Sequence, residues 1–395
     1  NKRPIVFFLM SSGIGGEVIT FLRMADWLAK NTERDVYVTD FKNGCVFKYM
    51  EQDGIKSVNK LIIPDCLSKN IKRFSQDTKL KLPDNALVFT NAFWAFSKGV
   101  IGELLSGNNV NFLFYFVDPN TVSDVSNRFS WLKRMIFLWK VRKIFRFCNK
   151  KKALVYQDYP NYVNVKKLVP NVEERYLPIP LQIPALVKTK FCRPENISFC
   201  YIGRNCRSKN NTLKFYVNNL VAYAQKYPEK RLKLFVVSDI KSKAAFFRRL
   251  KKTENFSLIF KGKMFGEELE KFLRKSVDIV LAMGVSCLEG AKLRLVSISA
   301  PASNKKIPVS VPVTLISDFC KYSTGGYWKK DNGYLKRYAF SDLIDTVTEN
   351  YDHYADACYQ YVKDNFQIDT IMPFFLRFLD KTQLSLDDME LKKWK

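Results

Sequence analysis

The chain has 395 residues and 47% of them are hydrophobic, so it is long enough for two domains with real cores and too apolar for a disordered protein. Its 65 Lys and Arg residues outnumber 38 Asp and Glu residues, and the net charge of +27 predicts a polyanionic partner: nucleic acid, an anionic membrane or a phosphorylated substrate. The nine cysteines include no Cys-x-x-Cys pair and there is one histidine, so neither a disulfide framework nor a zinc site is expected.

The sequence was searched for membrane-spanning and targeting segments. No run of about 18 uncharged apolar residues occurs, so no membrane-spanning helix is predicted. No signal peptide is visible, and the scattered cysteines favour the reducing cytoplasm. Because the chain begins with Asn1 rather than Met, we expect an N-terminal segment to precede it.

The first half alternates strand-like and helix-like runs, which is typical of parallel α/β architecture. It opens with a strand at 4–10, the loop SSGIGG and a helix at 17–30. Further strands are predicted at 35–39, 61–63, 86–90, 110–117 and 153–157.

The first loop, SSGIGGE at 11–17, places Gly13, Gly15 and Gly16 between a strand and a helix. Such glycines allow close backbone approach, and the helix start offers free amides to an anion or a sugar oxygen. The dinucleotide fingerprint G-x-G-x-x-G fails because its third position falls on Val18. A ligand loop and a simple tight turn both fit the pattern.

The segment RFSWLKRMIFLWKVRKIFRFCNKKK at 128–152 contains many cations and aromatic residues and no acid. One broad helical face carries Trp131, Leu132, Met135, Ile136, Leu138 and Trp139. The pattern favours a helix lying on an anionic cytoplasmic leaflet. The alternatives are a core-packing helix with snorkelling cations and a nucleic-acid contact.

Prolines cluster in LPIPLQIPALVKTKFCRP, where neither a helix nor a central strand is favoured, and this predicts the interdomain linker. We therefore expect an N-terminal domain at 1–180 and a C-terminal domain at 181–365. The second half again reads as strand, loop and helix, with strands at 197–202, 233–238, 256–261, 277–283 and 296–299. Two long helices, at about 341–365 and 368–380, are expected to end the chain.

Two loops of the second half carry groups that can bind an anion. In ISFCYIGRNCRSKNN a buried strand ends at Gly203, and Arg204 and Lys209 follow. Ligands of open α/β sheets bind outside the carboxyl ends of the strands, so the two cations suggest an anionic ligand, although a solvated basic loop is the plainer alternative.

The second of these loops is MGVSCLEGAKL at 283–293. Gly284 permits a tight turn and Ser286 is predicted to cap the helix, so that amides from Val285 onward face the same sheet edge. Glu289 either completes a capping box with Ser286 or accepts hydrogen bonds from ribose hydroxyls.

These segments resemble a known family. GRNCRSKN is similar to the Gly-Arg-x4-Lys segment of family 4-like glycosyltransferases with the GT-B fold, and MGVSCLEGAKL is similar to their donor-binding G-x-S-x-x-E segment. NGYLKRYAF, a long helix and YVKDNFQIDT resemble the end of such enzymes. The resemblance implies two Rossmann-like doubly wound domains facing each other across a cleft, with the C-terminal helix at about 366–395 packing back on the first domain.

The resemblance also implies roles for particular residues. Arg204 and Lys209 would hold the diphosphate of a nucleotide-sugar donor, with Gly203 and the amides after Gly284 beside them. Glu289 would hold the ribose.

Two departures from the family leave the stereochemical outcome open. Leu281 stands where many members have a second Glu, and the loop FYFVDPN offers Asp118 where many have a His. If the enzyme inverts, Asp118 is the first candidate for the catalytic base and Glu17 the second. Turn formation with Pro119 and stabilisation of a helix start are their structural alternatives.

The resemblance implies a glycosyltransferase that moves a sugar from a nucleotide-diphosphate sugar to a glycan or lipid-linked acceptor. The acceptor would lie near Gly15 and Gly16. The resemblance places such an enzyme in bacterial surface polysaccharide synthesis, peripheral on the inner face of the membrane.

No Asp-x-Asp occurs, and cations with helix amides would do the work of a metal, so no metal or cofactor is expected. The alternatives are a basic nucleic-acid-binding protein, which is not favoured because no recognised module appears, and a nucleotide-sugar epimerase or inactive relative on the same fold.

Overall fold

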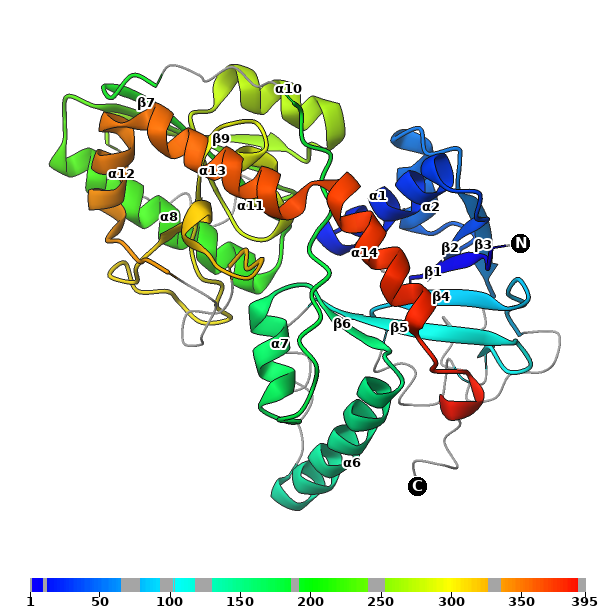
Figure 1. Ribbon diagram of the computed structural model, residues 1–395. Coiled ribbons are helices and arrows are strands. Elements are labelled where there is room, and N and C mark those ends of the chain that lie inside the picture. The colour runs from blue at the N-terminus through cyan, green and yellow to red at the C-terminus, as the bar shows by residue number, and fades with distance from the viewer. Residues whose placement is uncertain are drawn as a thin grey trace. The chain divides into compact units, whose positions relative to one another are not determined.

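The computed structural model describes residues 2–9, 13–64, 79–92, 102, 104–117, 130–185, 192–240, 253–325 and 335–389. The chain divides into two compact units (Figure 1). The first unit combines Asn1–Leu181 with Ile368–Lys395, and the second is Gln182–Gln367.

The first unit contains a six-stranded sheet in the order β3-β2-β1-β4-β5-β6, and every neighbouring pair is parallel. This order, with the first strand in the middle and later strands added on both sides, is that of a doubly wound nucleotide-binding sheet. The strands are β1 (Ile5–Phe8), β2 (Val36–Phe41), β3 (Asn59–Ile63), β4 (Ala86–Thr90), β5 (Val110–Phe116) and β6 (Leu154–Tyr156).

The central strands are buried on both faces, which is why their sequences are continuously apolar rather than alternating. Ile5 and Phe7 of β1 belong to one core cluster, with residues of α1 (Gly16–Asn31), α2 (Cys45–Gln52) and α14 (Ile368–Lys381). Val6 and Phe8 belong to the opposite cluster, with residues of α6 (Trp131–Lys150) and α7 (Tyr159–Lys166). A short 3-10 helix, η4 (Asp387–Met389), follows α14.

The second unit contains another six-stranded sheet, in the order β12-β11-β10-β7-β8-β9. Its first strand also lies in the middle, and all pairs are parallel except β11 with β12. The strands are β7 (Asn196–Ile202), β8 (Arg231–Val237), β9 (Phe256–Gly262), β10 (Ile279–Ala282), β11 (Val296–Ser299) and β12 (Thr314–Leu315). The predicted α/β class with two Rossmann-like sheets is therefore confirmed.

One long helix predicted in the second unit is interrupted. The helix expected at about 341–365 is two helices, because the chain turns at Asn350 between α12 and α13. The helices are α8 (Arg207–Lys226), α10 (Gly266–Ser276), α11 (Val285–Ala291), α12 (Phe340–Glu349) and α13 (Tyr351–Phe366), with the 3-10 helix η3 (Ile316–Asp318) after β12.

The basic helix α6 has two different halves. Its second half packs into the core through Val141, Ile144, Phe145 and Cys148. Its first half exposes large apolar side chains to solvent, with exposed fractions of 76% for Trp131 and 57% for Trp139. Figure 1 shows the amino-terminal end of α6 projecting away from the sheet. The core-packing interpretation therefore holds for the second half of the helix and fails for the first.

Within the described residues, no helix combines the length and the hydropathy that crossing a bilayer requires.

Candidate functional site

The two loops predicted to bind the donor lie beside each other in the second unit. They follow β7 and β10, which are neighbouring parallel strands with Tyr201 opposite Leu281. Strands are added to opposite sides of this pair, so the loops flank the point where the strand order reverses. This is the place where doubly wound sheets bind ligands.

The loop after β7 is held rigidly by its own hydrogen bonds. A Cβ at Gly203 would lie 2.7 Å from the hydroxyl oxygen of Tyr201, so the close approach requires glycine. The Tyr201 hydroxyl donates to the carbonyl of Lys209 at 2.7 Å, which ties the strand end to the first turn of α8. The amide of Asn205 donates to the carboxylate of Asp239 at 2.6 Å, so that amide is already satisfied.

Lys209 is a partly buried cation on the first turn of α8. Burial lowers the pKa of its ammonium to about 8, and the neighbouring Arg204 cation contributes to the decrease. No carboxylate in the described part of the chain forms an ion pair with it. A desolvated cation without a carboxylate partner is unfavourable, and the neighbouring Cys206 opposes part of the decrease in its pKa.

Arg204 differs from Lys209 because its side chain is exposed at the rim of the same loop. Its positive charge contributes to the lowered pKa of the Lys209 ammonium. An anion at this edge would thus meet one fixed cation and one that can move to meet it.

The loop after β10 corrects one prediction. Gly284, not Ser286, is the N-cap of α11, and its φ of +64° is a conformation that favours glycine. The Gly284 amide donates to the carbonyl of Thr324 at 2.9 Å. Val285 and Ser286 are the first two helical residues, and no described group accepts a hydrogen bond from their amides.

Glu289 does not form the capping box. Its carboxylate is buried and pairs with the ammonium of Lys292 at 2.7 Å. Lys292 also pairs with Glu270 of α10 at 2.5 Å, so one lysine joins two carboxylates. This ion-paired network fixes the orientation of Glu289 on α11.

The equivalent strand-order reversal in the first unit lies between β1 and β4. Gly15 is the N-cap of α1, Gly16 is its first residue, and Glu17 lies in its first turn. The side-chain amide of Asn91, which follows β4, donates to the carboxylate of Glu17. The structure thus brings Glu17 to the carboxyl edge of this sheet, whereas Asp118 lies outside the described residues.

Two residues at this edge were missed by the sequence analysis. Asp158 caps α7, where one carboxylate oxygen accepts from the backbone amide of Asn161 at 3.1 Å and from its side-chain amide at 2.6 Å. Burial raises the pKa of Asp158 to about 6. An Asp followed by Tyr-Pro at a helix start is a capping signal that the sequence does contain.

The other missed residue is Tyr115, near the end of β5. It is 1% exposed and its hydroxyl has no hydrogen-bond partner among the described residues. Burial raises its pKa, and the carboxylates of Asp158 and Glu17 add to the increase. A buried hydroxyl close to two carboxylates could not be inferred from the sequence, because it depends on which strands are neighbours.

No family model matches the chain, and no curated protein matches it. Several solved structures do. TarM of S. aureus, solved as a point mutant in complex with fondaparinux, alpha-GlcNAc-glycerol and UDP, is similar with a TM-score of 0.62 at 11% identity, over 96% of this chain and 100% of TarM.

Two further structures have the same layout. WaaG, a glycosyltransferase involved in lipopolysaccharide biosynthesis, gives a TM-score of 0.56 at 14% identity, over 96% of this chain and 99% of WaaG. The trehalose-6-phosphate synthase OtsA gives 0.52 at 11% identity, over 96% of this chain and 99% of OtsA. Together with the two doubly wound sheets, these likenesses show that the chain has the fold of GT-B glycosyltransferases.

Proposed function

We propose that this protein is a glycosyltransferase that moves a sugar from a nucleotide-diphosphate sugar to a glycan or lipid-linked acceptor in surface polysaccharide synthesis. The observation that carries the proposal is Lys209, a partly buried cation without a described counter-ion beside the strand-order reversal of the second sheet. The fold supports it, and TarM, which is similar in fold, was solved with UDP.

The donor's diphosphate would be the anion that completes the site. Lys209 and Arg204 would neutralise the negative charge that develops on the leaving diphosphate as the sugar bond breaks. Their positive charges would take the part that a divalent metal plays elsewhere, so the proposed reaction needs no metal. Glu289, oriented by Lys292, would accept hydrogen bonds from the ribose hydroxyls.

The acceptor would bind at the carboxyl edge of the first sheet, beside Gly15 and Gly16. Asp118 and Glu17 are the proposed candidates for the base that takes the acceptor's proton. The hydrogen bond from Asn91 supports Glu17, because it fixes the carboxylate in one orientation at that edge.

The first half of α6 is proposed to hold the enzyme on the inner face of the membrane. Trp131, Leu132 and Ile136 are at least half exposed, and a monomeric soluble surface rarely exposes contiguous apolar residues of this size. The same helix carries exposed cations, Lys133, Arg134 and Lys140, that would lie near anionic lipid headgroups.

A thermal-shift series with UDP, GDP, CMP and dTDP sugars tests the proposed donor site. A nucleotide that is present at roughly a hundred times its Kd should raise the unfolding midpoint by about 3 °C or more. Lys209→Ala and Arg204→Ala should each weaken that binding by about tenfold or more.

Lys233→Ala is the matched control, since Lys233 is exposed on β8 of the same unit, toward the amino end of the strand. This variant should bind like the unmodified protein. If both site variants keep the full shift, the donor site is misplaced. If no nucleotide sugar binds, the glycosyltransferase proposal fails.

A further inference from the structure

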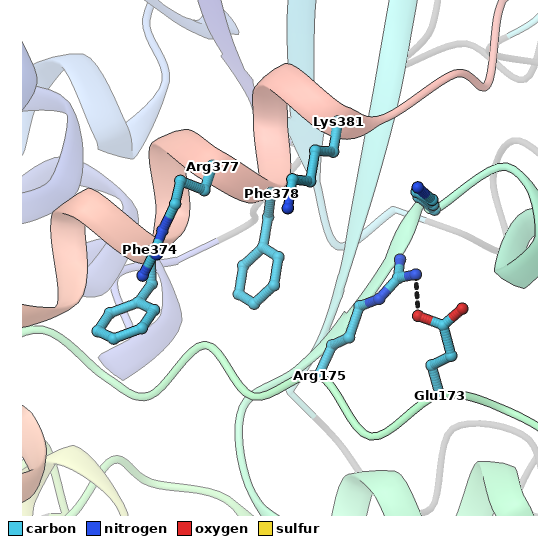
Figure 2. A pocket seen from close by; sticks show the side chains of 7 residues that line it. Glu173, Arg175, Phe374, Arg377, Phe378 and Lys381 are labelled. Atoms are coloured by element: carbon cyan, nitrogen blue, oxygen red, sulfur yellow. Dashed lines mark hydrogen bonds and ion pairs between the residues drawn. The ribbon is translucent and has the colours of Figure 1, made fainter.

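A cavity of about 480 Å³ lies within the first unit, between α14 and the segment after α7 beside β6. Figure 2 shows α14 on one side of this cavity and the segment after α7 on the other. Four cations line it, namely Lys152, Arg175, Arg377 and Lys381. Volumes of about 300–1,000 Å³ are usual for small-molecule sites, so this one is larger than a bare ion requires.

The position of the cavity separates it from Glu17 and Asn91. Lys152 lies two residues before β6, at the amino end of that strand. After α14, the hydroxyl of Thr382 donates to the carbonyl of Phe112 in the first half of β5. The amide of Gln383 donates to the carbonyl of Lys151 at 2.9 Å. Arg175, in contrast, lies level with the end of β6, where its carbonyl accepts from the amide of Tyr156 at 2.9 Å. The cavity therefore runs along the β6 side of the sheet, whereas Glu17 and Asn91 lie at the ends of β1 and β4.

The cations of the cavity are not neutralised by its acids. Glu173 is the one carboxylate in the lining, and it pairs with Arg175 (Figure 2). Among the residues that the structure describes, no carboxylate forms an ion pair with Lys152, Arg377 or Lys381. Four cations against one carboxylate leave three positive charges around the cavity.

The acids next to the cavity in sequence have other partners. Asp380 pairs with the Arg34 guanidinium at 2.9 Å, and Glu174 accepts from the hydroxyl of Tyr176 at 2.8 Å. The positive charge of the cavity is therefore not removed by a neighbouring side chain.

The lining also has an apolar part. Phe374 is 46% exposed, and the guanidinium of Arg377 stacks over its ring at 4.3 Å from the ring centre. Stacking holds the plane of the guanidinium and leaves its N–H groups able to donate to an anion. Phe378 adds a second ring to the lining. The combination suits a phosphate that is attached to a carbon skeleton better than a free inorganic ion.

We propose that this cavity binds a phosphate group carried by the acceptor, such as a phosphodiester or a sugar phosphate, at a distance from the reacting hydroxyl. The acceptor role rests on the proposed function, whereas phosphate binding at the cavity does not. A subsite of this kind would select phosphorylated acceptors over neutral glycans of similar size.

Isothermal titration of the full chain at low salt with glycerol 3-phosphate, and with glycerol as the neutral probe, tests the proposal. The unmodified protein should bind glycerol 3-phosphate and not glycerol. The double variant Arg377→Ala/Lys381→Ala should bind the phosphate probe at least about tenfold more weakly, because two charge-assisted contacts are lost.

The control is Lys42→Ala/Lys48→Ala, which removes the same charge from exposed lysines of the same unit outside the cavity. It should bind glycerol 3-phosphate like the unmodified protein. Equal binding by the cavity variant, or equal binding of glycerol and glycerol 3-phosphate, would overturn the proposal.

Two further measurements distinguish the proposed phosphate site from the proposed donor site and from a lipid-binding site. Lys209→Ala should leave glycerol 3-phosphate binding intact, and the cavity variant should keep the nucleotide-induced thermal shift, so the two proposals can fail independently. The cavity variant should also sediment with phosphatidylglycerol vesicles like the unmodified protein. Selective loss of vesicle binding would assign the cavity to lipid and overturn the acceptor role.

Discussion

At the scale of single residues, the candidate sites contain polar groups that the protein buries at a cost to its stability. Lys209 is a desolvated cation, and Tyr115 is a buried hydroxyl without a described partner. Asp158 is a buried carboxyl whose pKa is raised to about 6. Such groups lower stability, and functional sites are where proteins commonly retain them.

Lys209→Met should therefore make the ligand-free protein more stable and abolish nucleotide binding. Methionine keeps the aliphatic packing and removes the unpaired charge, which should raise the free energy of unfolding by about 1–3 kcal/mol at pH 7. Since burial lowers the pKa of Lys209 to about 8, the charge is present below pH 8, and the advantage of the variant should shrink as pH rises from about 8 toward 10.5. Urea unfolding at pH 7 and pH 10, with and without UDP, measures both effects. A destabilised variant, or one that still binds UDP, would contradict the assignment.

Asp158 predicts that the free energy of unfolding falls as pH rises, whereas Lys209 predicts that it rises with pH. Its pKa is raised from 3.8 to about 6 in the folded state, so the native protein favours the protonated carboxyl. Protonation of Asp158 therefore contributes to the free energy of unfolding. This contribution is complete below pH 3.8 and is lost as pH rises through 6. Its size is about 1.4 kcal/mol for each unit by which the folded-state pKa exceeds the unfolded-state pKa.

Asp158→Asn should remove this loss while keeping the helix cap, because one side-chain oxygen accepts both hydrogen bonds from Asn161. Relative to the unmodified protein, it should gain about 2.5 kcal/mol between pH 4 and pH 8 in urea titrations. Asp158→Ala is the control, since it loses the cap and should be less stable than Asp158→Asn by about 1 kcal/mol at each pH. Parallel pH profiles for Asp158→Asn and the unmodified protein would rule out the titration of this group.

At the scale of elements, continuous apolar runs were the most reliable signal. The strand predicted at 86–90 agrees residue for residue with β4, because a parallel strand that is buried on both faces is almost entirely apolar. The strand predicted at 296–299 also agrees with β11, although buried serines alternate there with Val and Ile. The helix cap at Ser286 was wrong, since the backbone reaches a φ of +64° at Gly284 and begins the helix there. Nothing local in the sequence distinguishes these two starts.

The pairings within the candidate sites could not be predicted, because they depend on how separate elements lie together. The hydrogen bond from Asn91 to Glu17 joins residues 74 positions apart, and the network of Glu289, Lys292 and Glu270 joins two helices. The sequence could indicate that Arg204 and Lys209 follow a strand. It could not indicate that the Lys209 ammonium is desolvated and lacks a described counter-ion.

The first half of α6 is the element whose role is most directly testable. Trp131→Ser/Ile136→Ser removes two exposed apolar side chains, and we expect at least about tenfold weaker partitioning into phosphatidylglycerol vesicles in a sedimentation assay. Binding of the unmodified protein should also weaken as salt is raised, because Lys133 and Arg134 lie on the same exposed half.

The matched control is Val309→Ser/Leu335→Ser, which removes two exposed apolar side chains from the second unit. It should bind vesicles like the unmodified protein. Equal partitioning of the α6 variant and this control would refute the membrane role of the helix.

At the scale of the whole molecule, the second unit interrupts the first. Residues 182–367 are inserted between the first unit's sheet and its last helix, so α14 completes a core that began with β1. Phe375 of α14 packs against Phe89 of β4, with ring centroids 4.6 Å apart, and against Phe7 of β1 at 5.9 Å. The core of the first unit therefore depends on residues from both ends of the chain.

Phe375→Ala should accordingly destabilise the protein by about 3–5 kcal/mol, since it opens a cavity in a fully buried aromatic cluster. Phe374→Ala is the matched control, because it makes the same substitution one position earlier on the same helix, where the ring is 46% exposed. It should lower the free energy of unfolding by less than about 1 kcal/mol. Urea unfolding followed by the signals of both units would measure the difference. Because Lys209 and the donor loops belong to the other unit, Phe375→Ala protein that remains folded should still bind UDP with unchanged affinity. Equal stabilities of the two variants would mean that α14 does not complete the core of the first unit in solution.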